Sequence, residues 1–256
     1  MFRTALAAAT LWVMTHVLGA IAILAHVLRI DDGRNRVQQW CMRTWAQSLC
    51  WAGGVNIVVH GAEHIDADRG TVYASNHLSW FDIFAVASVL PRYTFVAKAE
   101  LRKIWMFGWG AEGAGVVFMA RENRKSAFET YAEVASKVKD GLSVIVYPEG
   151  TRGNDYRLRP FKKGPFVLAI QAGAPVVPVV VYGTREIMPK GAWRVRGGTV
   201  HLHILAPVST TGYDYDHRHE LMNVVWQRMA DAMRDAHGVQ SGESNAVESP
   251  RLERSA

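Results

Sequence analysis

The feature that most constrains this chain is an uncharged apolar run near its beginning. Residues 5–28, ALAAATLWVMTHVLGAIAILAHVL, carry no formal charge when both histidines are neutral. As an α-helix this run would be roughly 36 Å long, enough to cross a hydrocarbon core of about 30 Å. A cleaved signal peptide with Arg3 as its positively charged n-region is the alternative, but the run is long for one. We therefore expect a membrane anchor.

The charges around this run predict its orientation. Arg3 precedes the run, whereas four arginines follow it: Arg29, Arg34, Arg36 and Arg43. Positive residues favour the cytoplasmic side of a membrane, so the following domain is expected on the cytoplasmic face, with a bacterial inner membrane as the expected location.

The next stretch predicts a second membrane-associated helix. Residues 37–54 place Trp40, Trp45 and Trp51 among polar residues, and tryptophan is favoured at the bilayer interface. Residues 1–53 are thus predicted to form membrane-anchoring helices.

Cysteine content and charge limit which class of protein this can be. The two cysteines, Cys41 and Cys50, can build neither a disulfide framework nor a CxxC metal pair, which is typical of a reducing compartment. A formal charge of +6 and a pI near 9.4 indicate anionic partners. Nucleic acid, anionic lipid and phosphorylated substrates all fit that balance.

Beyond the anchor, short apolar runs alternate with helical patterns. The runs predict strands at 55–60, 71–76, 93–98, 115–120, 142–147, 175–182 and 199–205. Helices are predicted at 80–90, 99–107, 124–139, 163–172 and 216–236. Strands that are apolar along their whole length indicate a sheet covered on both faces. The fold class is therefore α/β, with a largely parallel sheet sandwiched by helices over residues 54–238, and the polar tail 239–256 is predicted to be disordered.

Polar residues collect where predicted strands end. His77 follows one strand, Lys98 ends the next, Arg121 follows a third, and PEGTR (148–152) follows a fourth. Ligands bind at the carboxyl ends of strands in open α/β sheets, so these clusters predict one crevice.

Two interpretations of the segment SNHLSWFD (75–82) remain open. Ser79 and Asp82 have the spacing of a capping box, in which Asp82 only starts a helix. Alternatively, Asp82 accepts a hydrogen bond from His77, fixes its tautomer and leaves the other ring nitrogen free as a base.

The segment YPEGTR (147–152) also has two interpretations. Gly150 permits a tight turn, while Thr151 and Arg152 offer donors to an anion. The alternative is a surface turn closed by a Glu149–Arg152 ion pair.

Several chemistries lack their sequence signature. The chain has no G-x-S-x-G elbow, no Walker-type phosphate loop and no dinucleotide fingerprint. His201 and His203 share one face of a strand, but no third ligand completes a metal site there.

Four ordered blocks resemble the 1-acylglycerol-3-phosphate acyltransferase family. NHLSWFD (76–82) resembles its NHxxxxD motif, GVVFMAR (115–121) its GxxFxxR block, YPEGTR (147–152) its FPEGTR block and VPVVVYG (177–183) its fourth block. The blocks span roughly 71–185, and Tyr147 replaces the commoner phenylalanine.

The resemblance implies a membrane-tethered αβ domain that moves a fatty acyl group from acyl-CoA or acyl carrier protein to a lysophospholipid hydroxyl. It implies that His77 is the general base, that Asp82 orients it, and that the acceptor's phosphate and glycerol contact Arg121, Glu149, Gly150, Thr151 and Arg152. Lys98 is added as a substrate-binding residue because it ends a strand at the same crevice. Backbone N–H groups near Trp80 are candidate oxyanion donors.

No metal or organic cofactor and no nucleic acid are expected, and the partners are membrane lipids and the two substrates. The segment LRKIWMFGWG (101–110) would touch the bilayer, or else pack as a short helix. An acyltransferase for another lyso-lipid, a thioesterase and a non-enzymatic lipid-binding protein stay open as alternatives.

Overall fold

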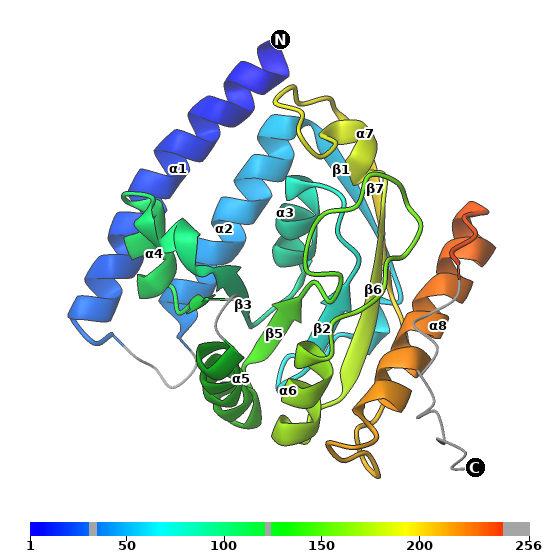
Figure 1. Cartoon of the computed structure of the whole chain (residues 1–256). Coiled ribbons are helices and arrows are strands. Elements are labelled where there is room, and N and C mark those ends of the chain that lie inside the picture. Colours follow the sequence, from blue (N-terminus) through cyan, green and yellow to red (C-terminus); the bar gives the residue numbers. More distant parts are fainter. Residues whose placement is uncertain (31–34, 121–123, 243–256) are drawn as a thin grey trace, which may run out of the picture.

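The computed structural model describes residues 1–30, 35–120 and 124–242 (Figure 1). Within them a seven-stranded sheet runs in the order β1-β7-β6-β2-β5-β3-β4. The strands are β1 (Val55–His60), β2 (Val72–Ser75), β3 (Tyr93–Lys98), β4 (Val117–Met119), β5 (Ser143–Val146), β6 (Val176–Tyr182) and β7 (Gly198–Ile204). Neighbouring strands pair parallel except β6 with β7. The predicted α/β class with a largely parallel sheet is confirmed.

Helices cover both faces of the sheet and enclose a core on each (Figure 1). One layer contains α1 (Phe2–Val27), α2 (Arg36–Gly53) and α3 (Trp80–Val89). The other contains α5 (Arg124–Lys139), α6 (Gly164–Ala172) and α8 (Arg218–His237). In β6, Val177 and Val179 face the first core while Val176 and Val180 face the second. This two-sided burial is why the strands are apolar throughout.

The predicted helix at 99–107 is wrong. The chain forms a 3-10 turn, η2 (Ala99–Lys103), and then a separate helix, α4 (Phe107–Gly113), with a left-handed backbone at Met106 (φ 59°) between them. The break lets α4 pack tightly on α1: a Cβ on Gly110 would lie 2.8 Å from Gly19 Cα. Two further short elements were not predicted, η1 (Ala62–His64) and α7 (Thr184–Ile187).

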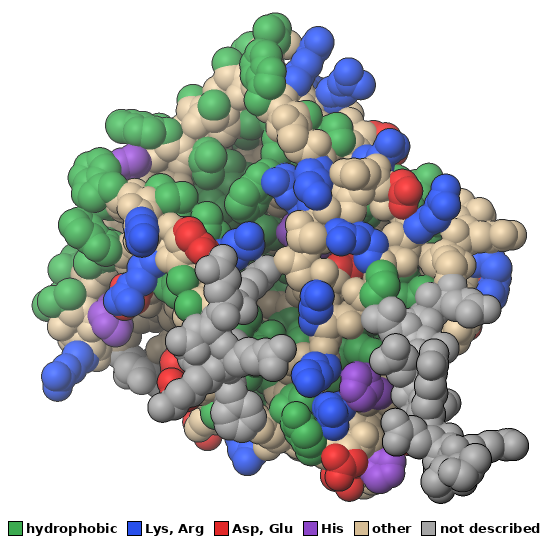
Figure 2. Space-filling model, viewed as in Figure 1, with side chains coloured by type: hydrophobic (Ala, Val, Ile, Leu, Met, Phe, Trp, Pro, Cys, Tyr) green, Lys and Arg blue, Asp and Glu red, His purple; other side chains and the backbone are tan. Residues whose placement is uncertain are grey.

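Among the described residues, α1 is the one helix long and apolar enough to cross a membrane, judged by length and composition. One side of the helix, which includes Leu18, Ala22 and Ala25, is buried in the molecule. Other large apolar residues of α1 are exposed: Leu11, Trp12, Val13, Val17 and Leu24. Trp109 in α4 and Trp105 just before it are exposed as well. Hydrophobic side chains gather over α1 and α4 along the left edge of the surface (Figure 2).

The second helix, α2, buries many of its residues inside the protein, whereas a helix lying in the bilayer interface would expose one side to lipid. It packs on α1 and α3, buries Cys41 and Cys50, and exposes Trp40 and Trp51. The division of the chain at residue 53 stays a prediction, as does contact of α2 with lipid. Most of the predicted tail, residues 243–256, lies outside the described residues.

Candidate active site

His77 lies at the carboxyl end of β2, held there by its neighbour Asn76. The buried Asn76 side chain donates from Nδ2 to the Val181 carbonyl (2.9 Å) and accepts at Oδ1 from the Val181 amide (2.7 Å). This pair of bonds ties the end of β2 to the end of β6, so the turn that carries His77 starts from a fixed point.

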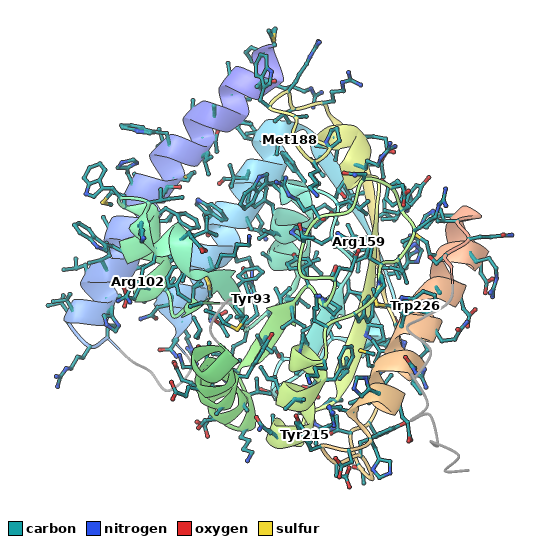
Figure 3. The ribbon with its side chains drawn as sticks, in the orientation of Figure 1. Tyr93, Arg102, Arg159, Met188, Tyr215 and Trp226 are labelled. Carbon is teal, nitrogen blue, oxygen red and sulfur yellow. The ribbon has the colours of Figure 1, made fainter. Side chains whose placement is uncertain are left out.

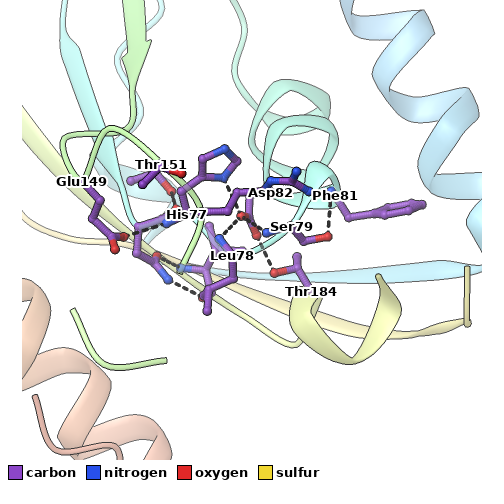
Figure 4. A network of polar contacts seen from close by, with 12 residues as sticks. His77, Leu78, Ser79, Phe81, Asp82, Glu149, Thr151 and Thr184 are labelled. Carbon is purple, nitrogen blue, oxygen red and sulfur yellow. Dashed lines mark hydrogen bonds and ion pairs between the residues drawn. The ribbon is translucent and has the colours of Figure 1, made fainter. Parts of the chain in front are cut away.

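The His77 ring contacts Asp82 directly (Figure 4). Nδ1 lies 2.9 Å from Asp82 Oδ2, and the same oxygen accepts from the amides of Leu78 (2.6 Å) and Ser79 (2.7 Å). The Asp82 side chain is fully buried, whereas 14% of the His77 side chain is exposed. Both interpretations of the motif therefore hold together: Asp82 completes the capping box of α3 and also binds the imidazole.

This geometry fixes which ring nitrogen can act as a base. An ionised carboxylate only accepts hydrogen bonds, so Nδ1 carries the ring hydrogen and Nε2 keeps its lone pair. Within the described part of the chain Nε2 has no hydrogen-bond partner. With Nδ1 bound to Asp82, the imidazole of this partly exposed side chain can act as a general base only through Nε2.

Tyr147 packs against the same imidazole. Its ring is stacked on the His77 ring at 4.2 Å between centroids. Burial raises the pKa of the Tyr147 phenol well above its ordinary value, with further contributions from Asp82 and Tyr93. The Tyr147 hydroxyl is buried with no partner among the described residues. A neutral aromatic wall therefore limits the rotation of His77.

Glu149 holds the backbone of His77. Its Oε1 accepts from the His77 amide at 2.9 Å, and the amide of Gly153 donates to the His77 carbonyl at 2.7 Å. Glu149 is only 5% exposed, and burial raises its pKa to about 7 against the hydrogen bond from His77 and the charge of Arg159. The Glu149–Arg152 ion pair of the alternative interpretation is absent from the described residues.

Residues 150–152 of the turn are partly or fully exposed. Gly150 has a left-handed backbone (φ 76°), and Thr151 is exposed next to His77 in Figure 4. The Arg152 guanidinium lies over the Trp80 ring, 5.1 Å from its centroid. The turn thus places one hydroxyl and one cation at the mouth of the site.

Arg159, which the sequence did not single out, supports this turn from behind. Its Nη1 donates to the carbonyls of Thr151 (3.3 Å) and Arg152 (3.5 Å). Its own carbonyl accepts from the indole of Trp226 on α8 at 3.3 Å (Figure 3).

The other predicted site residues are placed unequally. Lys98 is exposed at the end of β3, which is separated from β2 by β5 alone. Arg121 lies outside the described residues. The amides of Leu78, Ser79 and Phe81 already donate to side chains of the turn, so these three are not available as the oxyanion donors expected near Trp80. The described residues hold no group of three or more His, Cys, Asp or Glu side chains placed to bind a metal ion.

Known proteins resemble this chain over much of its length. Residues 56–182 match the family model described as Acyltransferase. The 1-acyl-sn-glycerol-3-phosphate acyltransferase alpha of Homo sapiens is 32% identical over 217 residues, 84% of this chain and 77% of the human protein. A chloroplastic 1-acyl-sn-glycerol-3-phosphate acyltransferase of Brassica napus is 35% identical over 196 residues, 75% of this chain and 57% of that protein.

A solved structure extends the likeness to the whole fold. The crystal structure of the 1-acyl-sn-glycerophosphate (LPA) acyltransferase, PlsC, from Thermotoga maritima matches with a TM-score of 0.78 and 28% identity, covering 94% of this chain and 97% of that one. The fold and the family model thus define an α/β protein of the acyltransferase class. More narrowly, the chain belongs to the 1-acyl-sn-glycerol-3-phosphate acyltransferase family, as its four blocks predicted. It spans 57% and 59% of the length of the chloroplastic relatives from Brassica napus and Arabidopsis thaliana.

Proposed function

We propose that this protein transfers a fatty acyl group from a thioester to the sn-2 hydroxyl of lysophosphatidic acid, giving phosphatidic acid and a free thiol in phospholipid biosynthesis. The observation that carries the proposal is the His77–Asp82 contact of 2.9 Å at the carboxyl edge of the sheet, with Nε2 of His77 left to act as a base. The names of the relatives support the substrate class.

In the proposed reaction, His77 Nε2 removes the proton of the acceptor hydroxyl as its oxygen attacks the thioester carbonyl. The tetrahedral intermediate collapses with cleavage of the carbon–sulfur bond. The imidazolium then returns its proton to the departing thiolate, so charge and protons balance. Asp82 stabilises the imidazolium in between, and no acyl-enzyme, metal or organic cofactor takes part.

The charged groups around the site are assigned to substrate binding. Arg152, held over Trp80, is proposed to bind the acceptor's phosphate together with Arg121, while Thr151 and Gly150 contact its glycerol. Glu149 contributes by fixing the His77 backbone. Lys98 is proposed to meet the anionic part of either substrate. The thioester donor is acyl-CoA or acyl carrier protein, which share the reacting group.

The protein is proposed to work at a membrane, with its αβ domain on the cytoplasmic face. The exposed apolar side of α1 and the neighbouring Trp105 and Trp109 support this (Figure 2). A base held close to lipid would meet an acceptor that resides in the bilayer.

The test is thiol release from acyl-CoA or acyl carrier protein thioesters by the detergent-purified protein, with and without lysophosphatidic acid. We expect release that depends on the acceptor, formation of phosphatidic acid, and a loss of about 10²- to 10⁴-fold in kcat for His77→Ala. His64→Ala, which changes a histidine outside the site, is the matched control and should retain activity. Both variants are first shown to be folded by circular dichroism.

Other outcomes would overturn parts of the proposal. Release without acceptor would identify a hydrolase, and turnover with a different lyso-lipid alone would replace the acceptor. Full activity of His77→Ala would remove the proposed base.

A further inference from the structure

The short helix α7 lies against the first turn of α3, on the far side of Asp82 from His77. Two side-chain hydrogen bonds join these segments. Thr184 Oγ1 donates to Asp82 Oδ1 (Figure 4). Ser79 Oγ donates to the Met188 carbonyl at 2.7 Å. Thr184, Ser79 and Asp82 are all fully buried. The contact therefore forms inside the protein, away from solvent.

The bond from Thr184 engages the carboxylate oxygen that His77 does not use. Asp82 Oδ2 already accepts from the His77 ring and from two backbone amides. Among the described residues, Thr184 supplies the one side-chain donor to Oδ1. A buried carboxylate with donors on both oxygens cannot rotate without breaking a bond, and an oxygen left without a donor would be costly.

The backbone before α7 is built to place this hydroxyl. Gly183, between β6 and α7, has φ +103°, and a Cβ there would lie 2.2 Å from the Thr199 carbonyl oxygen. Only glycine fits this turn, which directs Thr184 from the end of β6 towards the neighbouring end of β2. Asn76 and its bonds to Val181 tie the same two strand ends together.

We propose that Thr184 is a positioning residue for the reaction: its hydroxyl locks the Asp82 carboxylate, and Asp82 in turn holds His77 as the tautomer with hydrogen on Nδ1. Thr184 touches neither substrate nor the reacting atoms, so it acts through Asp82. The catalytic part of this inference rests on the proposed acyl transfer, whereas its effect on the imidazole does not.

The experiment compares Thr184→Val, Thr184→Ser and a matched control. Thr94→Val is the control because Thr94 is equally buried and donates to the Gly115 carbonyl at 2.8 Å, near the opposite end of the sheet. We expect Thr184→Val to lower kcat by about 10- to 100-fold, with KM within about twofold. Thr184→Ser, which restores the hydroxyl, should recover at least a third of the wild-type kcat, and Thr94→Val should retain most of it.

A second readout does not depend on turnover. The ring ¹⁵N shifts of His77, assigned by their loss in His77→Ala, report its tautomer in ¹⁵N-histidine-labelled protein. We expect a single Nδ1-protonated form in wild type and Thr184→Ser, and mixed tautomers in Thr184→Val.

The outcomes separate this inference from the proposed function. Thr184→Val with the kcat and histidine spectrum of the Thr94→Val control would overturn it, as would Thr184→Ser that is no better than Thr184→Val. If wild type transfers no acyl group, the proposed function fails, and the tautomer of His77 alone decides whether Thr184 positions it.

Discussion

At the scale of single residues, the buried Glu149 carboxyl links the third sequence block to the first. It fixes the backbone of His77 by accepting from its amide at 2.9 Å. Burial raises its pKa from 4.5 to about 7. The folded protein therefore holds a proton on Glu149 at pH values where the unfolded chain has released it.

This shift predicts how Glu149→Gln changes stability. The contribution of the protonated carboxyl is complete below pH 4.5 and is lost as the pH rises through 7. Glutamine keeps an accepting oxygen and does not ionise. Between pH 4.5 and pH 8, wild type should therefore lose about 3 kcal/mol of unfolding free energy that Glu149→Gln does not lose. Chemical unfolding at the two pH values measures this.

The control is Glu63→Gln, since the Glu63 side chain is 74% exposed. Its stability should follow that of wild type at both pH values. An equal change in the free energy of unfolding between the two pH values for Glu149→Gln and wild type would contradict the raised pKa of Glu149.

At the scale of elements, glycines decide where short helices can lie. Gly19 and Gly110 bring α1 and α4 into backbone contact, and Gly183 turns the chain from β6 into α7. At Gly110 and Gly183 a Cβ atom would collide with neighbouring backbone. A larger residue there would therefore displace the whole short helix.

Gly183→Ala tests this for α7. Alanine would be strained at φ +103° and would collide with the Thr199 carbonyl, so we expect a loss of about 3 kcal/mol or more in the free energy of unfolding. Gly173→Ala is the matched control: Gly173 is also left-handed (φ +60°), but nothing lies within 4 Å of its Cβ position, and about 1 kcal/mol is expected. Thermal unfolding compares the two, and equal losses would show that the backbone path alone matters.

At the scale of the whole molecule, four histidines from three elements cluster near the β1 edge of the sheet. His60 on β1 lies beside His201 and His203 on β7, and His237 ends α8. Ring nitrogens of His60 and His201 lie 3.2 Å apart, and those of His203 and His237 lie 2.9 Å apart. The His237 ring also stacks on Tyr182 of β6 at 3.8 Å. The end of α8 is therefore attached to the sheet through contacts of the His237 ring with His203 and Tyr182.

This cluster predicts a loss of stability in acid. Burial, with the charges of His60, His237 and His201, lowers the pKa of His203 from 6.5 to about 4. Below pH 6.5 the unfolded chain takes up a proton that the folded protein resists, so the free energy of unfolding falls until about pH 4. Between pH 7 and 4.5, wild type should lose on the order of 1 kcal/mol more than His203→Gln.

Chemical unfolding of both proteins at the two pH values tests this. The ionisation of Glu149 changes the stability of both proteins equally, so it cancels in the comparison. His64→Gln, outside the cluster, should behave as wild type. An identical loss in His203→Gln would show that the cluster does not resist protonation.

Much of this architecture could be predicted from local pattern. The seven strands were recognisable because a sheet buried on both faces needs continuous apolar runs, and each lies within a few residues of its predicted position. The proximity of His77 and Asp82 could also be predicted, since the two residues are five positions apart in a helix-starting turn. Arg121, Lys98, Gly150, Thr151 and Arg152 keep their predicted substrate roles as proposals.

Other features depend on contacts between distant parts of the chain. Thr184 and Asp82 are 102 residues apart, so no local spacing reveals their hydrogen bond. The break between η2 and α4 follows from the packing of Gly110 against Gly19 on α1. Glu149 looked like a ligand for substrate, yet its buried oxygen binds the His77 backbone. The sequence by itself determined the strands, the anchor-like first helix and the proximity of His77 to Asp82, because local periodicity and turn chemistry encode them. Only the tertiary structure decided what holds that pair in place, because burial and long-range hydrogen bonds exist only once the sheet has brought its strand ends together.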